Sequence, residues 1–191
     1  MITASRSAHQ GLTLIELLVV MAMVAITTTV AVPSFQNFIQ NNRLVTVANE
    51  LVSSLTLARS MAISQRAPSI VCRSANATAQ APACGGDGRW EDGWIVFSDL
   101  NGDNAFNAAN EPLWQQRGAA PALVEIGAGA NLDPMVRFAP IGTAPGFNGT
   151  FSVCDDRKGE ARHANRMREI VVSIVGRVRV VDGDGGTACP E

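Results

Sequence analysis

Two arginines near the C-terminus have a spacing that suits phosphate groups. Arg177 and Arg179 lie two positions apart in a valine-rich run, so in a strand their side chains fall on the same face. Their guanidiniums would then be about 6.5–7 Å apart, which roughly matches the phosphates of an extended nucleic-acid backbone. Gly176 before them permits a tight turn or the close approach of another backbone segment. The alternative interpretation is a solvated edge strand, where arginines discourage pairing with other chains.

The charges are unevenly distributed, although the formal net charge of the chain is only −2. Residues 157–179 hold seven Arg or Lys against two Glu, a net +5, and residues 84–111 hold six Asp or Glu against one Arg, a net −5. The small net charge argues against a dedicated nucleic-acid-binding protein, but the basic segment indicates an anionic partner at the C-terminal end. Besides the arginine pair, its cations are Arg157, Lys158, Arg162, Arg166 and Arg168.

Oxygen-bearing side chains alternate in the segment Asp99–Asp103, as at the start of an EF-hand calcium loop. The pattern then fails, because Asn104 stands where the sharp turn needs glycine and Asn110 where a bidentate glutamate is needed, with Glu111 one place late. Asp, Asn and Gly are also ordinary turn residues between two strands. We therefore favour a turn without a metal site, and a calcium loop is the alternative.

No constellation in the sequence predicts catalysis. His163 is the only histidine after His9, no nucleophile is clearly paired with it, and neither a phosphate-cradling nor a dinucleotide-binding glycine motif occurs. The large aromatic side chains are expected in a core or between strands more often than on a binding platform. They are Trp90, Trp94, Phe97 and Trp114. We predict a protein that is not an enzyme and has no cofactor.

A long apolar stretch, from Leu12 to Val32, dominates the N-terminal part of the chain. As a helix it would span roughly 31 Å, which is the thickness of the hydrocarbon core of a bilayer. Glu16 is the only charged residue between Leu12 and Gln40, and a carboxylate at mid-membrane costs on the order of 2.5–3.5 kcal/mol. A simple anchor or a cleaved secretory signal is the alternative, but neither needs this carboxylate. We therefore expect Glu16 to have a function.

The pattern beyond this stretch becomes amphipathic and keeps a helical period. Pro33 lacks an N–H donor and is expected to kink the helix. Residues 12–65 are predicted to form one long, gently bent helix that ends before Pro68. Its second half has apolar residues at three-four spacing, which predict one buried stripe formed by Leu44, Ala48, Leu51, Leu55, Ala58 and Ala62.

Short β-type runs separated by Gly, Asn, Asp and Pro follow Pro68. A helix packed on an antiparallel sheet of consecutive hairpins is an α+β fold, and the length allows one such domain. The predicted strands are Ser69–Arg73, Trp94–Ser98, Leu113–Gln116, Leu123–Ile126, Met135–Phe138, Thr150–Cys154, Ile170–Ile174 and Arg177–Val181.

Four cysteines lie in this domain, which is expected to be outside the cytoplasm, where disulfides form. A zinc site is the alternative, but the sequence has no Cys-x-x-Cys pair and only one histidine in this region. Among three possible pairings we favour Cys72–Cys84, which closes a loop rich in Gly and Ala, and Cys154–Cys189, which ties down the tail.

The segment Gly11–Glu16, Gly-Leu-Thr-Leu-Ile-Glu, resembles the prepilin signal of type IV pilins and type II secretion pseudopilins. This resemblance implies that a prepilin peptidase cleaves after Gly11 and N-methylates Leu12. It also implies that Glu16 neutralises the terminal amine of a neighbouring subunit in a filament, with Glu16 and Pro33 serving assembly. Leu12 departs from the commoner Phe, and the leader has only Arg6 and His9 as basic groups.

Nearly the whole chain is similar to the GspH/FimT class of minor pilins and pseudopilins, and the similarity is weakest across residues 74–93 and 118–150. The likeness rests on Cys154–Gly159, Ile170–Ile174, the Gly-Arg-x-Arg run and the terminal Cys, and on Asn42-Arg43 and Leu57–Ile63 in the helix. FimT-type minor pilins are implicated in binding DNA for natural transformation through the Gly-Arg-x-Arg region. Carried over, this assigns DNA binding to Gly176, Arg177 and Arg179, flanked by the other cations of residues 157–168. Asp182 and Asp184 before Cys189 depart from that pattern and oppose the positive potential.

The resemblance implies a pilin-like architecture in four parts. Residues 1–11 are a leader, 12–33 a transmembrane and filament-core helix, 34–66 its amphipathic half, and 67–191 a β-rich periplasmic or extracellular domain. The expected function is that of a minor pilin, first a single-pass inner-membrane protein and then part of a pilus near its tip. Its expected partners are prepilin peptidase, other minor and major pilins, and double-stranded DNA bound without sequence preference. A GspH-like pseudopilin of a type II secretion system is the alternative.

Overall fold

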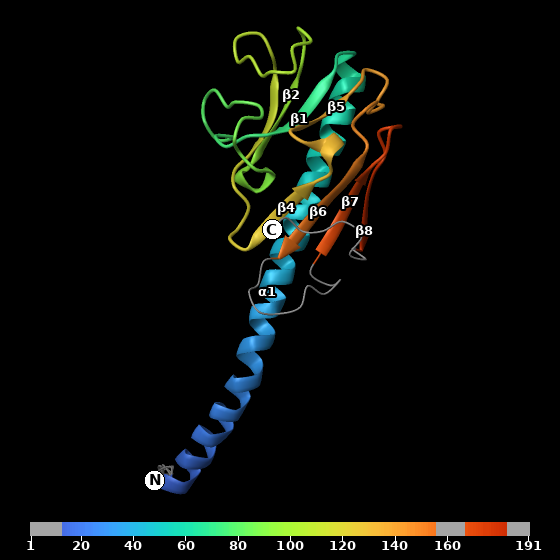
Figure 1. Ribbon diagram of the computed structural model, residues 1–191. Coiled ribbons are helices and arrows are strands. Elements are labelled where there is room, and N and C mark those ends of the chain that lie inside the picture. The colour runs from blue at the N-terminus through green and yellow to red at the C-terminus, as the bar shows by residue number, and fades with distance from the viewer. Residues whose placement is uncertain (1–12, 156–166, 183–191) are drawn as a thin grey trace, which may run out of the picture. The chain divides into compact units, whose positions relative to one another are not determined.

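The computed structural model describes residues 13–155 and 167–182 of the 191-residue chain. The chain divides into two compact units, Met1–Ile39 and Gln40–Glu191, and helix α1 (Leu14–Gln65) contributes to both. Figure 1 labels the helix and the strands. All residues of both hydrophobic clusters belong to the second unit, so this unit contains its own complete core, as an independently folding domain does.

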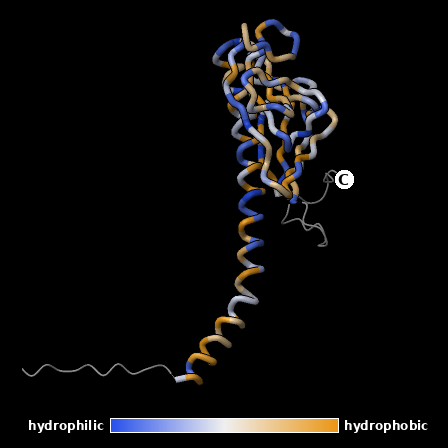
Figure 2. The backbone as a smooth tube through the Cα atoms, turned by 90° about the vertical axis from the view of Figure 1, so that its left-hand side faces the viewer, coloured by the Kyte–Doolittle hydropathy of each residue, from blue (hydrophilic) through white to orange (hydrophobic). Residues whose placement is uncertain are grey.

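The N-terminal part of α1 is apolar on every side. Thr13 caps it, because the N–H of Glu16 donates to Thr13 Oγ1 at 3.3 Å and that of Leu17 donates to Thr13 O at 3.2 Å. The described side chains from Leu14 to Ile39 are exposed, and Figure 2 shows this half of the helix mainly in the hydrophobic colour. Among the described residues, α1 is the one helix long and apolar enough to cross a membrane.

The helix continues through Pro33 without a break, as predicted for a single helix. Pro33 offers no N–H to the carbonyl one turn earlier, so the ladder is weakened there. Three threonines before it donate their hydroxyls to carbonyls of the preceding turn at 2.7–3.0 Å, a pattern that satisfies polar groups inside an apolar helix. They are Thr27, Thr28 and Thr29.

The second half of α1 packs against strands with one face. The predicted stripe is confirmed, since all six of its residues are buried, and Leu51, Leu55, Ala58 and Ala62 are completely so. They form one core cluster with side chains from both sheets, among them Trp94, Phe138 and Phe151. The helix ends at Gln65, where Arg66 takes a left-handed φ of 52° and Pro68 follows. The core therefore joins the helix to both sheets.

Two antiparallel four-stranded sheets make up the rest of the domain, in the orders β3-β2-β1-β5 and β4-β6-β7-β8. Figure 1 shows both beside the C-terminal half of α1. The first sheet has β1 (Ser69–Arg73), β2 (Trp94–Ser98), β3 (Leu113–Arg117) and β5 (Met135–Phe138). The second has β4 (Val124–Ala128), β6 (Gly149–Asp155), β7 (Met167–Val172) and β8 (Val178–Asp182). Two short 3-10 turns, η1 (Trp90–Asp92) and η2 (Ala130–Leu132), complete the elements.

The topology corrects the prediction of one sheet built from consecutive hairpins. The strand β5 pairs with β1, while its neighbours in sequence, β4 and β6, pair with each other. The central strands β1 and β2 have apolar side chains on both faces, so they need a second cover, which a small cluster containing Ile95, Phe97 and Phe106 supplies. The predicted strands Ile170–Ile174 and Arg177–Val181 differ in their bounds from β7 and β8, because residues 173–177 form the turn between the two strands.

The cysteine prediction is confirmed in part. Cys72 in β1 is bonded to Cys84, with the two Cα atoms 5.6 Å apart, and this bond ties the 74–93 loop to the first sheet. Cys154 is buried in β6, but Cys189 lies outside the described residues, so the Cys154–Cys189 pairing stays a prediction. Trp90, Trp94 and Phe97 are buried, as expected of core aromatics, and Trp114 donates to Ser98 Oγ at 2.9 Å.

Candidate functional site

Glu16 lies in the first turn of α1, three residues after its capping threonine. A carboxylate there is stabilised by the positive end of the helix dipole. The side chain is exposed, and no cation among the described residues contacts it. Gly11 and Leu12 lie outside the described residues. The carboxylate is thus placed at the end of an uncovered apolar helix, where an external cation can reach it.

The Gly-Arg-x-Arg run forms the turn into β8. The N–H of Gly176 donates to Ser173 O at 2.8 Å, and the N–H of Arg177 donates to Ser173 Oγ at 3.0 Å. Gly176 has a φ of +75°, which only glycine adopts without strain. Arg177 and Arg179 are both exposed, and neither forms an ion pair with a described residue. Their guanidiniums are therefore available to an external anion.

A close backbone contact holds this turn against the β5–β6 loop. A Cβ on Gly176 would lie 1.9 Å from Gly142 O, so the contact requires glycine. Arg59 of α1 reaches the same place, where its Nε donates to Gly142 O at 2.9 Å and its Nη2 to Val175 O at 3.4 Å. The N–H of Ala144 also donates to Ile174 O at 2.9 Å. Three segments distant in sequence are thus fastened together.

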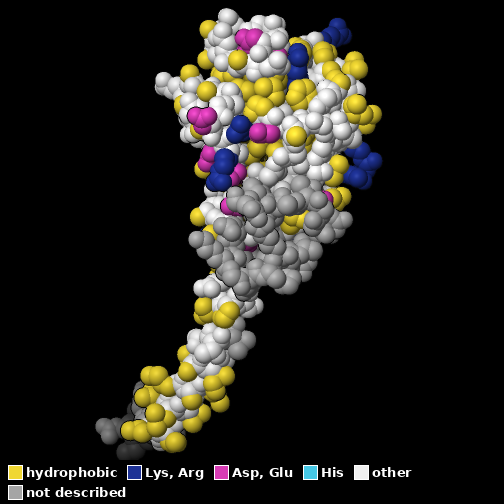
Figure 3. Space-filling model, in the orientation of Figure 1, with side chains coloured by type: hydrophobic (Ala, Val, Ile, Leu, Met, Phe, Trp, Pro, Cys, Tyr) yellow, Lys and Arg dark blue, Asp and Glu magenta, His cyan; other side chains and the backbone are white. Residues whose placement is uncertain are grey.

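We call this end of the domain the arginine end and define it as residues 59–68, 137–148 and 173–179. These three segments contain no Asp, Glu or Lys, and they contain the arginines Arg59, Arg66, Arg137, Arg177 and Arg179. Arg66 is exposed, whereas Arg137 is partly covered and has its Nη2 3.6 Å from Asp99 Oδ2. Figure 3 shows basic and hydrophobic side chains side by side at the upper right of the domain.

None of the cations predicted to flank Arg177 and Arg179 is a described residue of the arginine end. Arg157, Lys158, Arg162 and Arg166 lie outside the described residues, as does His163. Arg168 is half-buried in β7, opposite Asp182 in the register with β8, and donates from Nη1 to Met167 O at 3.0 Å. The arginine that the fold does bring to the β5–β6 loop and the β7–β8 turn is Arg59 of α1, and Arg66 follows directly after the end of the helix. In the sequence, the position of Arg59 is indicated only by its spacing, because it lies four residues after Leu55 and three before Ala62 of the buried stripe.

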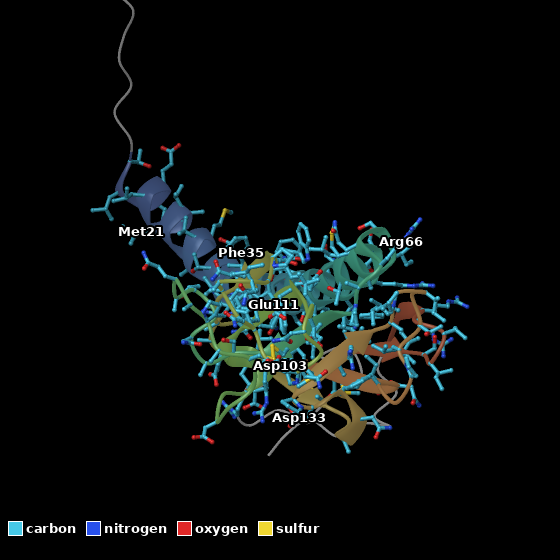
Figure 4. The ribbon with its side chains drawn as sticks, turned by 90° about the horizontal axis from the view of Figure 1, so that it is seen from above. Met21, Phe35, Arg66, Asp103, Glu111 and Asp133 are labelled. Carbon is cyan, nitrogen blue, oxygen red and sulfur yellow. A yellow bond between two sulfur atoms is a disulfide. The ribbon has the colours of Figure 1, made fainter. Side chains whose placement is uncertain are left out.

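Three of the six acidic residues in segment 84–111 are buried, namely Glu91, Asp99 and Glu111. Asp99, Asp103 and Glu111 converge, and one carboxylate oxygen from each lies within 4.8 Å of the others, although Glu111 is one place late for an EF-hand. Both oxygens of Glu111 accept backbone hydrogen bonds from the loop, at 3.0 and 2.9 Å. Asp99 accepts one at 2.8 Å and faces Arg137. Three such carboxylates can bind a divalent cation, but these contacts also account for their arrangement by themselves. Figure 4 labels Asp103 and Glu111 close together, away from Arg66.

Comparison with known proteins matches both parts of the chain. Residues 6–32 match the Prokaryotic N-terminal methylation motif, and residues 47–176 match the family described as Type II transport protein GspH. The chain belongs to the GspH family. The second match covers more than half of the chain, so the resemblance to the GspH/FimT class is confirmed. No curated protein shows a significant match to this GspH-family chain.

Two solved structures resemble the GspH-family chain, both of the type IV minor pilin FimU from Pseudomonas aeruginosa (strain PAO1). One crystal form has a TM-score of 0.54 and 21% sequence identity, and covers 81% of this chain and 97% of FimU. The other has a TM-score of 0.48 and 20% identity, and covers 76% and 96%. The likeness to the first form shows a shared fold, which confirms the prediction of an α+β, pilin-like architecture.

Proposed function

We propose that the protein is a minor pilin of a type IV pilus. Prepilin peptidase cleaves after Gly11, Leu12 becomes the methylated N-terminus, and α1 holds the subunit in the inner membrane with its domain in the periplasm. The subunit then enters the filament, near the tip, beside other minor and major pilins. The observation that carries the proposal is the methylation motif over residues 6–32, followed directly by an uncovered apolar helix with Glu16 in its first turn.

The cleavage at Gly11 and the filament assignment can be tested together. We expect the chain purified from cells to lack residues 1–11 and to begin at N-methylated Leu12, and to be recovered in sheared pili. The measurement is intact-mass and N-terminal peptide spectrometry of that fraction, with a strain lacking prepilin peptidase as the control. A full-length or unmethylated chain in assembled pili would contradict the proposal.

The alternative is a GspH-like pseudopilin of a type II secretion system, which the description of the matched family favours. Deletion of the chain separates the two functions. A minor pilin would be needed for surface piliation and not for secretion, whereas a pseudopilin would be needed for secretion and not for piliation.

A second proposed function is the binding of double-stranded DNA through Arg177 and Arg179. Its support is that both guanidiniums are exposed next to one turn and pair with no described acid. Arg177 at the end of the turn and Arg179 in β8, two positions apart, can present planar donors to phosphates without contacting bases, so the binding would have no sequence preference. Gly176 would then act by shaping the turn.

Removal of both arginines should weaken DNA binding. We expect a fragment beginning at Gln40 to shift duplex DNA at low salt, and Arg177→Ala with Arg179→Ala to lower the salt slope by about 0.9 per lost phosphate contact. The control is Arg43→Ala, which removes one exposed arginine that lies about 24 Å along the helix from Arg59 and is to be compared with Arg177→Ala alone. Equal binding by these two single variants would refute the assignment.

A further inference from the structure

Exposed aliphatic side chains gather at the arginine end. Ile141 is 79% exposed, Val175 59%, Ile174 55% and Ile63 50%. They come from the last turns of α1, the β5–β6 loop and the β7–β8 turn, which the contacts of Arg59 and Gly176 hold together. Single exposed apolar side chains are normal, but several of them gathered on one surface indicate an interaction site.

The three segments that carry these side chains are in direct contact with one another. The methyl end of Ile63 lies 2.8 Å from the position that a Cβ on Gly142 would take, so helix and loop are in direct contact. The N–H of Ala144 bonds to Ile174 O, which fixes the loop to the turn. The aliphatic groups are therefore presented together by the fold.

The charges around the aliphatic side chains are all positive within the three segments. Arg66, Arg177 and Arg179 are exposed, and Arg59 lies among the aliphatic residues with its guanidinium bonded to both loops. The β5–β6 loop also borders a hollow of about 280 Å³. It is lined by Pro68, Arg137, Ala139, Pro140, Pro145 and Phe147, so its walls are mainly apolar, and its one charged residue, Arg137, has its Nη2 3.6 Å from Asp99 Oδ2.

We propose that the arginine end docks on an anionic lipid surface. The isoleucine and valine side chains enter the boundary between head groups and acyl chains, and the arginines contact lipid phosphates. DNA would use the same positive charge but would leave the four aliphatic side chains in water, because a duplex offers phosphates and no apolar phase at its surface. A lipid surface satisfies both kinds of side chain. This inference does not depend on DNA binding, with which it shares only Arg177 and Arg179.

Vesicle co-sedimentation tests the proposal with the fragment beginning at Gln40, which contains the whole core. We expect the fragment to bind vesicles of phosphatidylcholine with phosphatidylglycerol at least about tenfold better than vesicles of phosphatidylcholine alone. Ile174→Ser with Val175→Ser should lower that binding by roughly tenfold or more. The same variant should bind duplex DNA as the unchanged fragment does. The matched control is Leu100→Ser with Leu123→Ser, which removes two exposed leucines elsewhere and should leave vesicle binding unchanged.

Several outcomes would overturn the proposal. They are equal binding to both kinds of vesicle, no binding to either, an unchanged affinity of the Ile174/Val175 variant, and sedimentation of the fragment without vesicles, which would indicate contact between copies. If the turn variant melts at a lower temperature, Ile63→Ser with Ile141→Ser repeats the test from the other two segments. If the Ile174/Val175 variant loses DNA binding and the unchanged fragment does not bind vesicles, the surface is a DNA site and the lipid proposal is wrong.

Discussion

Replacement of Glu16 by alanine is expected to leave the chain in the membrane and to reduce its recovery in sheared pili by at least about tenfold. The resemblance to prepilins implies that the carboxylate pairs with the terminal amine of a neighbouring subunit, and an opposite charge 4 Å away is worth about 4 kcal/mol at an effective dielectric constant of 20. Insertion should not suffer, because removal of a charged side chain lowers the cost of placing an apolar helix in a bilayer. The measurement is immunoblotting of membrane and sheared fractions.

Two further variants separate charge from shape at this position. Glu16→Gln keeps most of the side chain and loses the charge, so it should behave like the alanine variant. Glu16→Asp keeps the charge on a shorter side chain and should retain part of the recovery. Normal incorporation of the glutamine variant would show that charge neutralisation does not select the assembled state.

Replacement of Gly176 by alanine is expected to lower the free energy of unfolding by about 3 kcal/mol. The methyl group would meet a backbone carbonyl oxygen at 1.9 Å, that of Gly142, which cannot move away as a flexible side chain could. The left-handed φ of +75° adds its own strain for any residue with a Cβ. Urea denaturation of the fragment beginning at Gln40, followed by tryptophan fluorescence, measures the change.

Gly146 supplies the control for this variant. It has a similar φ of +84°, but a Cβ there would meet no atom within 4 Å. Gly146→Ala should therefore cost about 1 kcal/mol, from the backbone conformation alone. The difference between the two variants measures the close approach between the turn and the β5–β6 loop. Equal losses would mean that this approach is not maintained in solution.

The local elements could be predicted from the sequence because their signals are local. The three-four spacing from Leu44 to Ala62 marks the buried face of α1, and all of its residues are buried. Three strands, β1, β2 and β5, have the predicted bounds, since Gly, Pro and Asp separate their short apolar runs. The Cys72–Cys84 bond spans only 12 residues and was predicted from the composition of the enclosed loop.

The arrangement of these elements could not be predicted because it depends on distant contacts. The pairing of β5 with β1 follows from packing around the helix, and no nearby residue encodes it. The convergence of Glu111 with Asp99 was not predicted, because the segment was compared only with the EF-hand loop, in which Glu111 stands one place late. Arg59 was likewise not assigned to the basic end, since 83 residues separate it from Gly142, whose carbonyl it binds.

The burial of α1 between strands of both sheets also determines how the domain would carry a mechanical load. Leu51, Leu55 and Ala58 are completely covered, and Glu50 of the helix binds Arg117 of β3 at 2.6 Å. A pull along the helix would have to slide close-packed side chains past both sheets before the domain could separate from it. Tension on such a subunit is therefore shared by the core cluster around the helix, so resistance to force and resistance to heat should both depend on the residues of that cluster.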